Sequence, residues 1–287
     1  MRCQLPGRST YSEEPVAFPR IGVRRAGDRL GCRGYDRGVL GETVPGPEAG
    51  ERGEATPRFS IVIPAHNEES YLPATLEHVA TLNYPRDGYE VIVVENGSTD
   101  RTLEVARRFE GGNVRVVVSQ KTGVSAAKNH GIDQLSPHSQ WVIFLDADTL
   151  LKPGFLNDLQ AKVDSARRPL AIGTTTVTPL DGDLKARAWF AYYDFSHRFG
   201  GSYAIQIAKR SLFPALRFDE DLRMGEDALL IRKARKQGRF FYLSTRTVHT
   251  STRRFDTAGY WRIFFRYWYF SLLPVRFWKA FDYKVIR

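Results

Sequence analysis

Short apolar runs alternate with helical patterns along the chain from Phe59 onward. Runs of about five apolar residues bounded by polar or turn residues predict buried strands of a parallel sheet. We expect such strands at residues 59–64, 90–94, 114–118 and 141–145. The intervening patterns predict helices at residues 72–82, 102–109 and 126–135. This alternation is typical of an α/β fold with a mostly parallel central sheet flanked by helices.

The second half of the chain has a less regular pattern. It predicts helices at residues 155–167, 184–199 and 226–236, and strands at residues 170–177, 203–208 and 239–243. Residues 260–284 combine many aromatic residues with arginine and lysine, which predicts an aromatic and basic helical tail. We therefore divide the chain into a domain at residues 58–255 and an amphipathic C-terminal tail at residues 256–287.

Residues 1–57 differ in composition from the rest of the chain, because they are rich in glycine, proline and arginine and lack apolar periodicity. Such a segment cannot bury enough apolar surface to offset the entropy lost on ordering. We expect a disordered leader here, or sequence upstream of the true start.

Net charge, cysteine content and hydropathy limit the partners and the cellular compartment that we expect. The net charge of +10 favours anionic partners such as nucleic acid, a membrane surface or a phosphorylated substrate. The two cysteines, Cys3 and Cys32, imply neither a disulfide framework nor a zinc site, so a reducing cytoplasmic setting is the default. Neither a secretory signal nor an uncharged apolar run of about 20 residues is found, so the sequence does not predict a membrane-spanning helix.

Two carboxylates follow the predicted strand at residues 141–145. Asp146 and Asp148 are separated by one alanine and fall at the carboxyl end of that strand, where open α/β sheets place their ligands. Two ionised carboxylates this close repel each other, and a hard divalent cation such as Mg²⁺ or Mn²⁺ relieves that repulsion. The alternative is an ordinary polar loop after a strand.

Five blocks of the chain resemble family 2 glycosyltransferases of the GT-A fold, which transfer sugars from nucleotide-diphospho-sugars. The blocks are residues 61–69, 93–100, 123–131, 145–148 and 225–227, in the order typical of that family. The resemblance implies a GT-A fold, a nucleotide-sugar donor and a divalent cation. Together the blocks are far more specific than any one of them.

The resemblance also implies roles for individual residues. It places the donor against Pro64, Ala65, Asn67, Glu68, Glu95, Lys128 and Asp146. Asp148 is the expected direct metal ligand, and Asp146 contacts the ribose or the metal. Glu95 stands where the family usually has aspartate, which leaves the identity of the base open. Lys128 stands where arginine is commoner, and a lysine does not make the bidentate contact that an arginine makes. Asn67 and Glu68 also suit a turn and a helix start.

Two later residues complete the expected site. Asp227 is the candidate general base, because an inverting transfer needs a carboxylate to take the proton of the acceptor hydroxyl. Carboxylates at a helix start also have a purely structural explanation. His249 is a candidate metal ligand, and the alternative is a partly buried histidine bonded to backbone. Arg253 and the following arginine resemble a basic stretch that could hold phosphates.

The tail leaves two interpretations open. Aromatic and cationic side chains suit the headgroup level of a bilayer, which would fit a lipid-linked or cell-envelope glycan acceptor at the inner face of the plasma membrane. The other interpretation is an amphipathic helix that packs on the domain and completes its core.

Two other functions compete with the glycosyltransferase hypothesis. Residues 145–149 also fit the Asp-x-Asp-x-Thr motif of haloacid-dehalogenase-type phosphatases, with Asp146 as nucleophile. Those enzymes carry the motif on their first strand, whereas three predicted strands precede it here. A non-enzymatic protein that binds nucleic acid or membranes would explain the positive charge, but we expect no nucleic-acid partner because no motif of such a fold is present.

Overall fold

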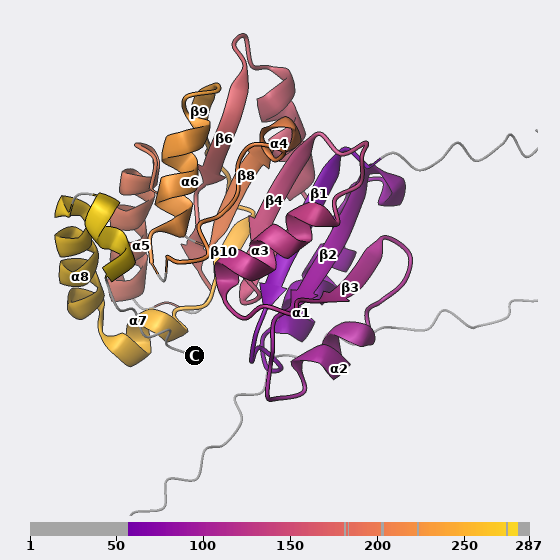
Figure 1. The fold of residues 1–287 in the computed structure, drawn as a ribbon, viewed down its shortest axis with the longest axis horizontal. Helices are drawn as coiled ribbons and strands as arrows, with labels where there is room; N and C mark the ends of the chain where they lie inside the picture. The colour runs from indigo at the N-terminus through magenta and orange to yellow at the C-terminus, as the bar shows by residue number, and fades with distance from the viewer. Residues whose placement is uncertain are drawn as a thin grey trace, which may run out of the picture. The chain divides into compact units, whose positions relative to one another are not determined.

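The computed structural model describes residues 57–180, 182, 184–201, 204–222, 224–273 and 275–280, and Figure 1 shows its fold. The predicted leader, apart from Pro57, and the last residues of the predicted tail lie outside the described residues. In the first half the elements follow the predicted order closely. They are β1 (Phe59–Ala65), α1 (Leu72–Ala80), β2 (Tyr89–Glu95), α2 (Thr102–Arg107), β3 (Val114–Val118), α3 (Val124–Asp133) and β4 (Trp141–Leu145).

The second half contains the predicted helices and strands together with short elements that the pattern did not predict. Its elements are β5 (Thr149–Leu151), α4 (Phe155–Asp164), β6 (Leu170–Thr175), β7 (Thr178–Pro179), α5 (Leu184–His197), β8 (Ile205–Lys209), α6 (Glu226–Ala234), β9 (Arg239–Leu243), β10 (Val248–Thr250), α7 (Arg253–Ala258) and α8 (Tyr260–Leu272). Three single-turn or two-turn 3₁₀ helices complete the described chain: η1 (Arg86–Gly88), η2 (Arg210–Leu212) and η3 (Val275–Ala280).

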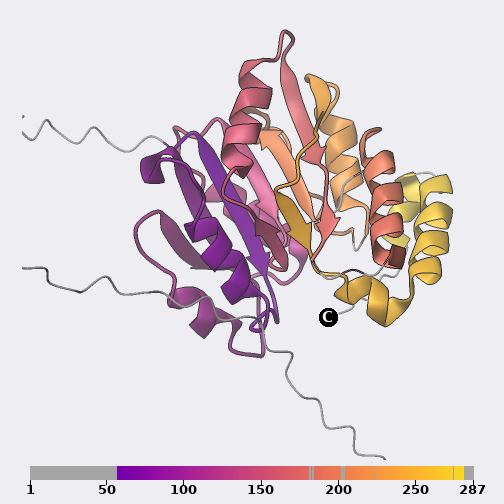
Figure 2. The same cartoon turned by 180° about the vertical axis from the view of Figure 1, so that it is seen from behind.

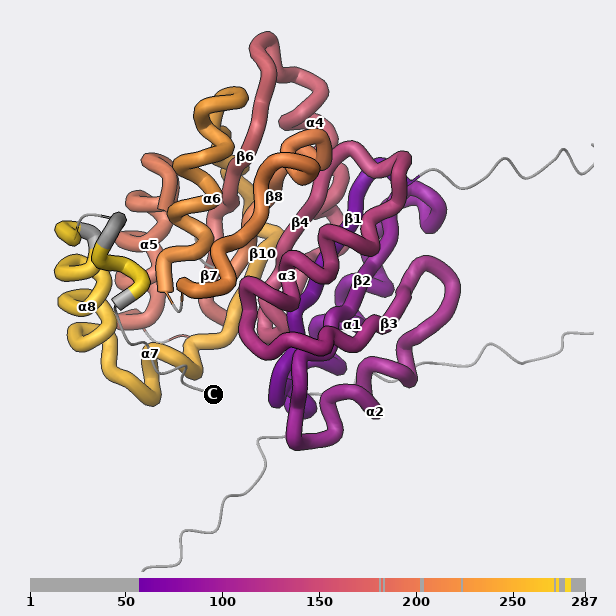
Figure 3. Tube along the Cα trace, in the orientation of Figure 1, coloured from indigo at the N-terminus to yellow at the C-terminus, as the bar shows by residue number. Residues whose placement is uncertain are grey.

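Seven of the described strands form one sheet in the order β3-β2-β1-β4-β8-β6-β9. β1 pairs in parallel with both β2 and β4, and β2 with β3, so the predicted parallel arrangement is confirmed for the first half. β8 is antiparallel to both of its neighbours, β4 and β6, which the apolar pattern did not predict. Figure 3 shows this order across the sheet, from β3 to β6.

The short strands β5, β10 and β7 form a second sheet beside the first. β10 places Thr250 opposite Thr149, directly after the two carboxylates of the β4 exit. Segments of two or three residues show too little periodicity to be predicted, so this second sheet was not expected from the sequence.

Helices lie on both faces of the main sheet, as Figures 1 and 2 show from the two sides, and each face has its own hydrophobic cluster. Alternate residues of a strand point to opposite faces, so β1 buries Ile61 and Ile63 on one face and Val62 on the other. The first face packs against α1, α4, α5 and the inner side of α8. The second face packs against α3 and α6. The predicted α/β class, with helices flanking a mostly parallel sheet, is therefore confirmed.

α8 is the longest element of the predicted tail, and its inner side belongs to the main core. Tyr260 and Ile263 are buried there with Phe255 of α7. Within the described part of the chain, every helix is too short or too polar to cross a membrane.

Candidate active site

The exit loops of β1 and β2 are bound tightly to each other. The side-chain oxygen of Asn67 accepts a hydrogen bond of 2.8 Å from the backbone N–H of Thr99, and the N–H of Asn67 donates to Ser98 Oγ at 3.1 Å. Asn67 has a positive φ of 54°, which asparagine tolerates better than most residues. The N–H of Glu68 donates to Thr102 Oγ1 at 2.8 Å. Asn67 therefore shapes this loop, in keeping with the turn role that its residue type allows.

The other predicted donor contacts on these strands lie at the same edge. Pro64 and Ala65 end β1, and the carbonyl of Ala65 accepts from the N–H of Asn96 at 2.9 Å. Glu95 is buried at the end of β2, and its carboxylate accepts from the N–H of Ser98 at 2.5 Å. The glutamate thus caps its own loop. Asn96, which sequence reasoning did not single out, accepts from the N–H of Gly123 at 2.6 Å and joins the β2 and β3 exits.

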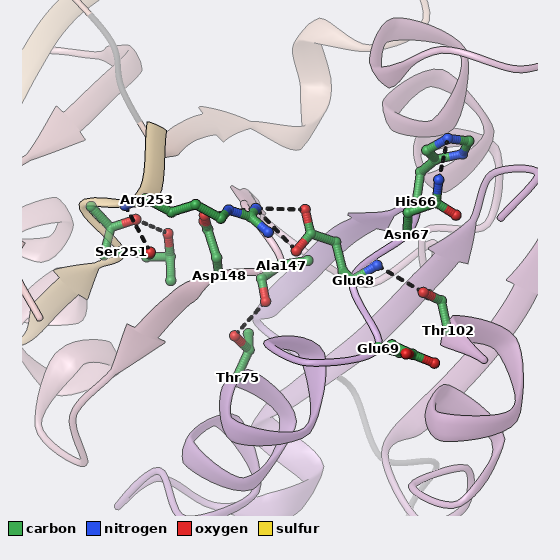
Figure 4. A network of polar contacts seen from close by, with 12 residues as sticks. His66, Asn67, Glu68, Glu69, Thr75, Thr102, Ala147, Asp148, Ser251 and Arg253 are labelled. Atoms are coloured by element: carbon green, nitrogen blue, oxygen red, sulfur yellow. Dashed lines mark hydrogen bonds and ion pairs between the residues drawn. The ribbon is translucent and has the colours of Figure 1, made fainter. Parts of the chain in front are cut away.

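Arg253 joins the β1 and β4 exits, as Figure 4 shows. One of its terminal nitrogens lies 2.9 Å from Glu68 Oε1 and 3.3 Å from Asp148 Oδ2. The guanidinium also lies 4.2 Å from the centre of the Tyr71 ring, within cation–π range. Burial raises the pKa values of Glu68 and Asp148, and the charge of Arg253 opposes that rise in both. Three segments distant in sequence thus form one acidic cluster with a shared cation.

Asp227 forms a second acidic cluster with a deeply buried lysine. Lys128 Nζ lies 2.8 Å from Asp227 Oδ1 and 3.1 Å from Gln206 Oε1, and the lysine side chain is 2% exposed. The amide nitrogen of Gln206 donates to Asp227 Oδ2 at 2.9 Å. Both carboxylate oxygens of Asp227 therefore accept hydrogen bonds from fixed donors. Burial alone would lower the pKa of Lys128, but nearby carboxylates raise it above its usual value.

Asp146 lies between the two clusters. Burial, opposed by the charge of Lys128, raises the pKa of Asp146 to about 7, and the carboxylates of Asp148 and Asp227 add to the rise. The backbone N–H of Asp146 donates to the carbonyl of Ala204 at 3.0 Å, which fixes the strand exit against the start of β8. The Asp146 carboxylate is thus electrostatically coupled to both acidic clusters.

Glu226 adds a further buried carboxylate beside Asp227. Burial and the charge of Asp227, opposed by Lys128, raise its pKa to about 7. The preceding Gly225 has a φ of +84°, and a Cβ there would lie 2.6 Å from the Phe270 ring of α8. Only glycine suits this position, because it combines a left-handed backbone with close ring packing. The acidic motif is therefore held against the inner side of α8.

His249 lies away from these carboxylates. Its Nδ1 is 2.9 Å from Thr178 Oγ1, and its Nε2 is 3.2 Å from the carbonyl of Arg246. Successive residues of a strand point to opposite faces, and the next residue, Thr250, faces Asp148. Among the residues that the structure describes, no three His, Cys, Asp or Glu side chains lie close enough to hold a metal ion. The predicted third ligand therefore does not join Asp146 and Asp148 in this structure.

Asp146 and Asp148 nevertheless suit a divalent cation. Both carboxyl groups have raised pKa values, and the negative charge of Asp148 contributes to the rise at Asp146. A bound cation would offset this unfavourable burial of negative charge, and carboxylate oxygens are the donors that Mg²⁺ and Mn²⁺ prefer. The residues present thus fit the cation that the sequence predicts.

Sequence reasoning missed Gln206 and Tyr71, although Gln206 left a signal. It is a buried amide between two buried isoleucines of the strand Ile205–Lys209, and a polar residue at a core position calls for an explanation. Tyr71 is a half-buried turn residue directly before α1 and carries no comparable signal.

A family model described as "Glycosyl transferase family 2" matches residues 60–232, more than half of the chain. The chain therefore belongs to glycosyl transferase family 2, as the five blocks predicted. The match includes the exits of β1, β2 and β4 and both acidic clusters up to Asp227, but it ends before Arg253. It leaves the phosphatase and non-enzymatic alternatives without support.

Comparisons with individual proteins agree. GgaA of Bacillus subtilis, described as a minor teichoic acid biosynthesis protein, is 26% identical over 210 residues, which cover 64% of this chain and 46% of GgaA. A fragment of TarS from Staphylococcus aureus, solved in complex with UDP-GlcNAc, superposes with a TM-score of 0.57 at 22% identity, covering 68% of this chain and 59% of that one. The chain spans less than half the length of the curated relatives it matches.

A mannosyltransferase from Pyrobaculum calidifontis, solved in complex with GDP-Man and Mn²⁺, gives a TM-score of 0.57 at 20% identity. The alignment covers 77% of this chain and 67% of the mannosyltransferase. At this level of identity the structural matches establish the fold, which is the GT-A fold that the sequence predicted.

Proposed function

We propose that this protein is a metal-dependent glycosyltransferase that moves a sugar from a nucleotide-diphospho-sugar to an acceptor hydroxyl with inversion. One observation carries the proposal: β4 leads directly into Asp146 and Asp148, and the paired strand β8 holds Asp227 through Gln206, which lies opposite Phe144. A donor-side and an acceptor-side carboxylate in one site are what a single displacement requires. Family membership and the UDP-GlcNAc complex of TarS support a nucleotide-sugar donor.

The donor pocket is proposed along the linked exits of β1 and β2. Pro64, Ala65 and Asn67 shape its floor, and Glu68 is available to a ribose or base once Arg253 is shared with the donor phosphates. Glu95 would act through the loop that it caps, rather than by direct contact. Lys128 lies behind Asp227 and would act on the donor through its charge.

The divalent cation, Mn²⁺ or Mg²⁺, would be held by Asp146 and Asp148. Once bound, it would supply positive charge to the departing diphosphate. Arg253 would add charge on the same side, since its guanidinium already lies beside Asp148. Crystallisation of the mannosyltransferase with Mn²⁺ supports this cofactor.

Asp227 is proposed as the general base. The acceptor oxygen attacks the anomeric carbon, the bond from that carbon to the diphosphate oxygen breaks, and the nucleoside diphosphate leaves with the electron pair. The acceptor proton passes to a carboxylate oxygen of Asp227. Lys128 and Gln206 would hold that carboxylate in one orientation throughout, because each donates to a different oxygen.

The acceptor is proposed to be a glycan or a lipid-linked glycan of the cell envelope. The name of GgaA, a teichoic acid biosynthesis protein, supports this class. A lipid-linked acceptor would bring the enzyme to the cytoplasmic face of the plasma membrane, where the proposed contact of its C-terminal tail would also hold it.

The donor can be tested without knowing the acceptor. Thermal shift of the full chain with UDP-, GDP- and dTDP-sugars, each with and without Mn²⁺, should show stabilisation by one donor that is lost on chelation. Failure of all three donors in the presence of Mn²⁺ would reject nucleotide-sugar binding.

Two carboxylate variants then separate the roles. Asp148→Asn should lose the Mn²⁺-dependent stabilisation. Asp227→Asn should keep it, because Asp227 lies on the acceptor side, while slowing sugar transfer by about 10²–10⁴-fold. Wild-type transfer rates in Asp227→Asn would refute the assignment of the base.

A further inference from the structure

The outer side of α8 exposes a continuous apolar stripe. Trp261, Phe265, Trp268 and Leu272 follow the spacing i, i+4, i+7, i+11 and are 57–64% exposed. This spacing places them on one side of the helix. The opposite side, with Tyr260, Ile263 and Phe270, is buried. α8 is therefore apolar on two sides, only one of which the domain covers.

α5 repeats this arrangement. Leu184 and Phe195, at i and i+11, are 84% and 60% exposed, and Tyr192 and Phe199 are exposed beside them. The buried side of α5 holds Ala186, Phe190 and His197. A monomeric soluble domain rarely leaves two neighbouring helices with such large exposed side chains.

The two stripes meet along the seam between the helices. The Trp189 ring of α5 contacts Tyr192 on its own helix and Trp261 on α8, with centroids 6.2 and 5.5 Å apart. The Phe264 ring contacts the same two exposed rings at 5.7 and 6.0 Å. The exposed residues of the two helices therefore form one surface, which we call the α5–α8 surface. In Figure 1 these helices lie at the end of the molecule away from β2 and β3.

Within the described spans of α5 and α8, the exposed charged residues are all basic. Lys185, Arg187 and Arg262 are exposed on the two helices. The acidic residue within the described span of these helices, Asp194, is half-buried and accepts a hydrogen bond from Tyr242. Aromatic rings ringed by cations match a bilayer surface, where rings enter the headgroup layer and cations meet anionic lipid. Two copies meeting through this surface would instead bring like charges together.

We propose that the α5–α8 surface docks the protein on the surface of an anionic lipid bilayer. This surface extends beyond the predicted C-terminal tail, because α5 supplies half of it. The docked helices lie in the plane of the headgroups and do not cross the bilayer.

Docking would also orient the active site, a consequence that rests on the proposed function. The inner side of α8 contacts the acidic motif through Phe270 and Gly225, and the charges of Glu226 and Asp227 act on Tyr267 of the same helix. The proposed base therefore lies on the core side of the helix whose outer side would meet the membrane, which suits an acceptor attached to a lipid.

The test is co-sedimentation of the full chain with two kinds of vesicle. One is phosphatidylcholine alone, and the other is phosphatidylcholine with about 30% phosphatidylglycerol, which gives the vesicle a negative surface potential. We expect binding to the anionic vesicles that weakens with salt. The triple variant Trp261→Ser, Phe265→Ser, Trp268→Ser should bind at least tenfold more weakly. Val118→Ser, a control at an exposed apolar residue of β3, should bind like the wild type.

Several outcomes would overturn the proposal. These are wild-type protein that stays in the supernatant with anionic vesicles, or a triple variant that sediments as well as the wild type. A wild-type dimer that the triple variant converts to monomer, without vesicle binding, would assign the surface to a second copy. Circular dichroism checks that the variant is folded. Donor-dependent thermal shift should survive in it, so loss of docking is distinguishable from failure of the proposed function.

Discussion

Arg253 and Lys128 each neutralise a group of carboxylates, but they do so at different depths. Arg253 is 19% exposed and bridges Glu68 and Asp148, whose side chains are 13% and 20% exposed. Lys128 is 2% exposed and is enclosed by Asp227, Gln206 and the Phe218 ring, which lies 5.0 Å from its nitrogen. The first cluster joins the exit loops of β1 and β4 to the first residue of α7, whereas the second joins α3, β8 and the first turn of α6.

This difference in exposure suits the two cations to different roles in the site. A cation near the surface can exchange one partner for another, because water solvates whichever group is released. A buried lysine cannot leave without stranding the charges around it. The Arg253 cluster therefore suits the side of the site where donor and metal come and go, and the Lys128 cluster suits a carboxylate that must keep one orientation.

The largest effect is expected from Lys128→Met. Removing the buried cation leaves the carboxylates of Asp227, Glu226 and Asp146 without the charge that offsets theirs, which should lower the free energy of unfolding by about 3 kcal/mol. Urea denaturation at pH 7.5 measures it. Lys121→Met is the matched control, since Lys121 pairs with Glu220 on the surface and its loss should leave the stability unchanged. Equal losses in the two variants would erase the contrast between a buried and an exposed cation.

Glu226→Gln tests the buried charge by pH. The folded protein holds the pKa of Glu226 at about 7, above its value of 4.5 in a model peptide. The folded state therefore binds more protons between these values, so this group makes the wild type less stable as pH rises through that window. Relative to the wild type, Glu226→Gln should gain about 2 kcal/mol between pH 5 and pH 8.

Urea denaturation in EDTA at the two pH values measures this gain. Glu104→Gln, at an exposed helical ion pair, should behave the same at both values. A variant that gains nothing at pH 8 would mean that Glu226 titrates normally in the folded protein.

Arg253→Gln should have a smaller effect on stability, about 1 kcal/mol, because its carboxylate partners are partly solvated. The effect on metal should be larger: without the guanidinium, Asp148 loses a competing cation, so Mn²⁺ alone should bind several-fold more tightly at pH 8. Calorimetric titration with MnCl₂ measures this. Arg101→Gln, which pairs with Glu69 on the neighbouring loop, is the control and should leave Mn²⁺ affinity unchanged. Weaker Mn²⁺ binding in Arg253→Gln would show that the arginine supports the metal site.

The smallest effect on metal is expected from His249→Ala. Both ring nitrogens already have partners in Thr178 and Arg246, so the Kd for Mn²⁺ should change less than about twofold. Such a change corresponds to a difference of about 0.4 kcal/mol in binding free energy. The same titration applies, with Asp148→Asn as the variant that should lose binding. A loss in His249→Ala as large as that in Asp148→Asn would restore the histidine as a ligand.

The first half of the chain was readable from the sequence because its signals are local. The strands at residues 114–118 and 141–145 match the predicted bounds, and the other strands of the first half agree within about one residue. Parallel strands buried on both faces must be apolar throughout, and their exits must be polar. The placement of Glu68, Asp146 and Asp148 at one edge follows from that rule alone.

Side-chain partners across the fold were beyond such a reading. Gln206 is 78 residues from Lys128 and 21 residues from Asp227, and only the antiparallel insertion of β8 beside β4 brings these residues together. The contact of His249 with Thr178 shows the same limit: residue type suggested a metal ligand, but the pairing that brings Thr178 to 2.9 Å from its Nδ1 could not be predicted from the sequence.

By itself the sequence determined the family, the order of strands and helices, and the carboxylates available for chemistry. Apolar periodicity and polar strand exits encode these features locally, within a few residues. Only the tertiary structure decided which cation serves which carboxylate, and which side of α8 faces the core. Both depend on strand order and helix packing between segments far apart in the chain. A buried charged or polar side chain must pair with a polar group that the fold places beside it, and that neighbour comes from a distant segment.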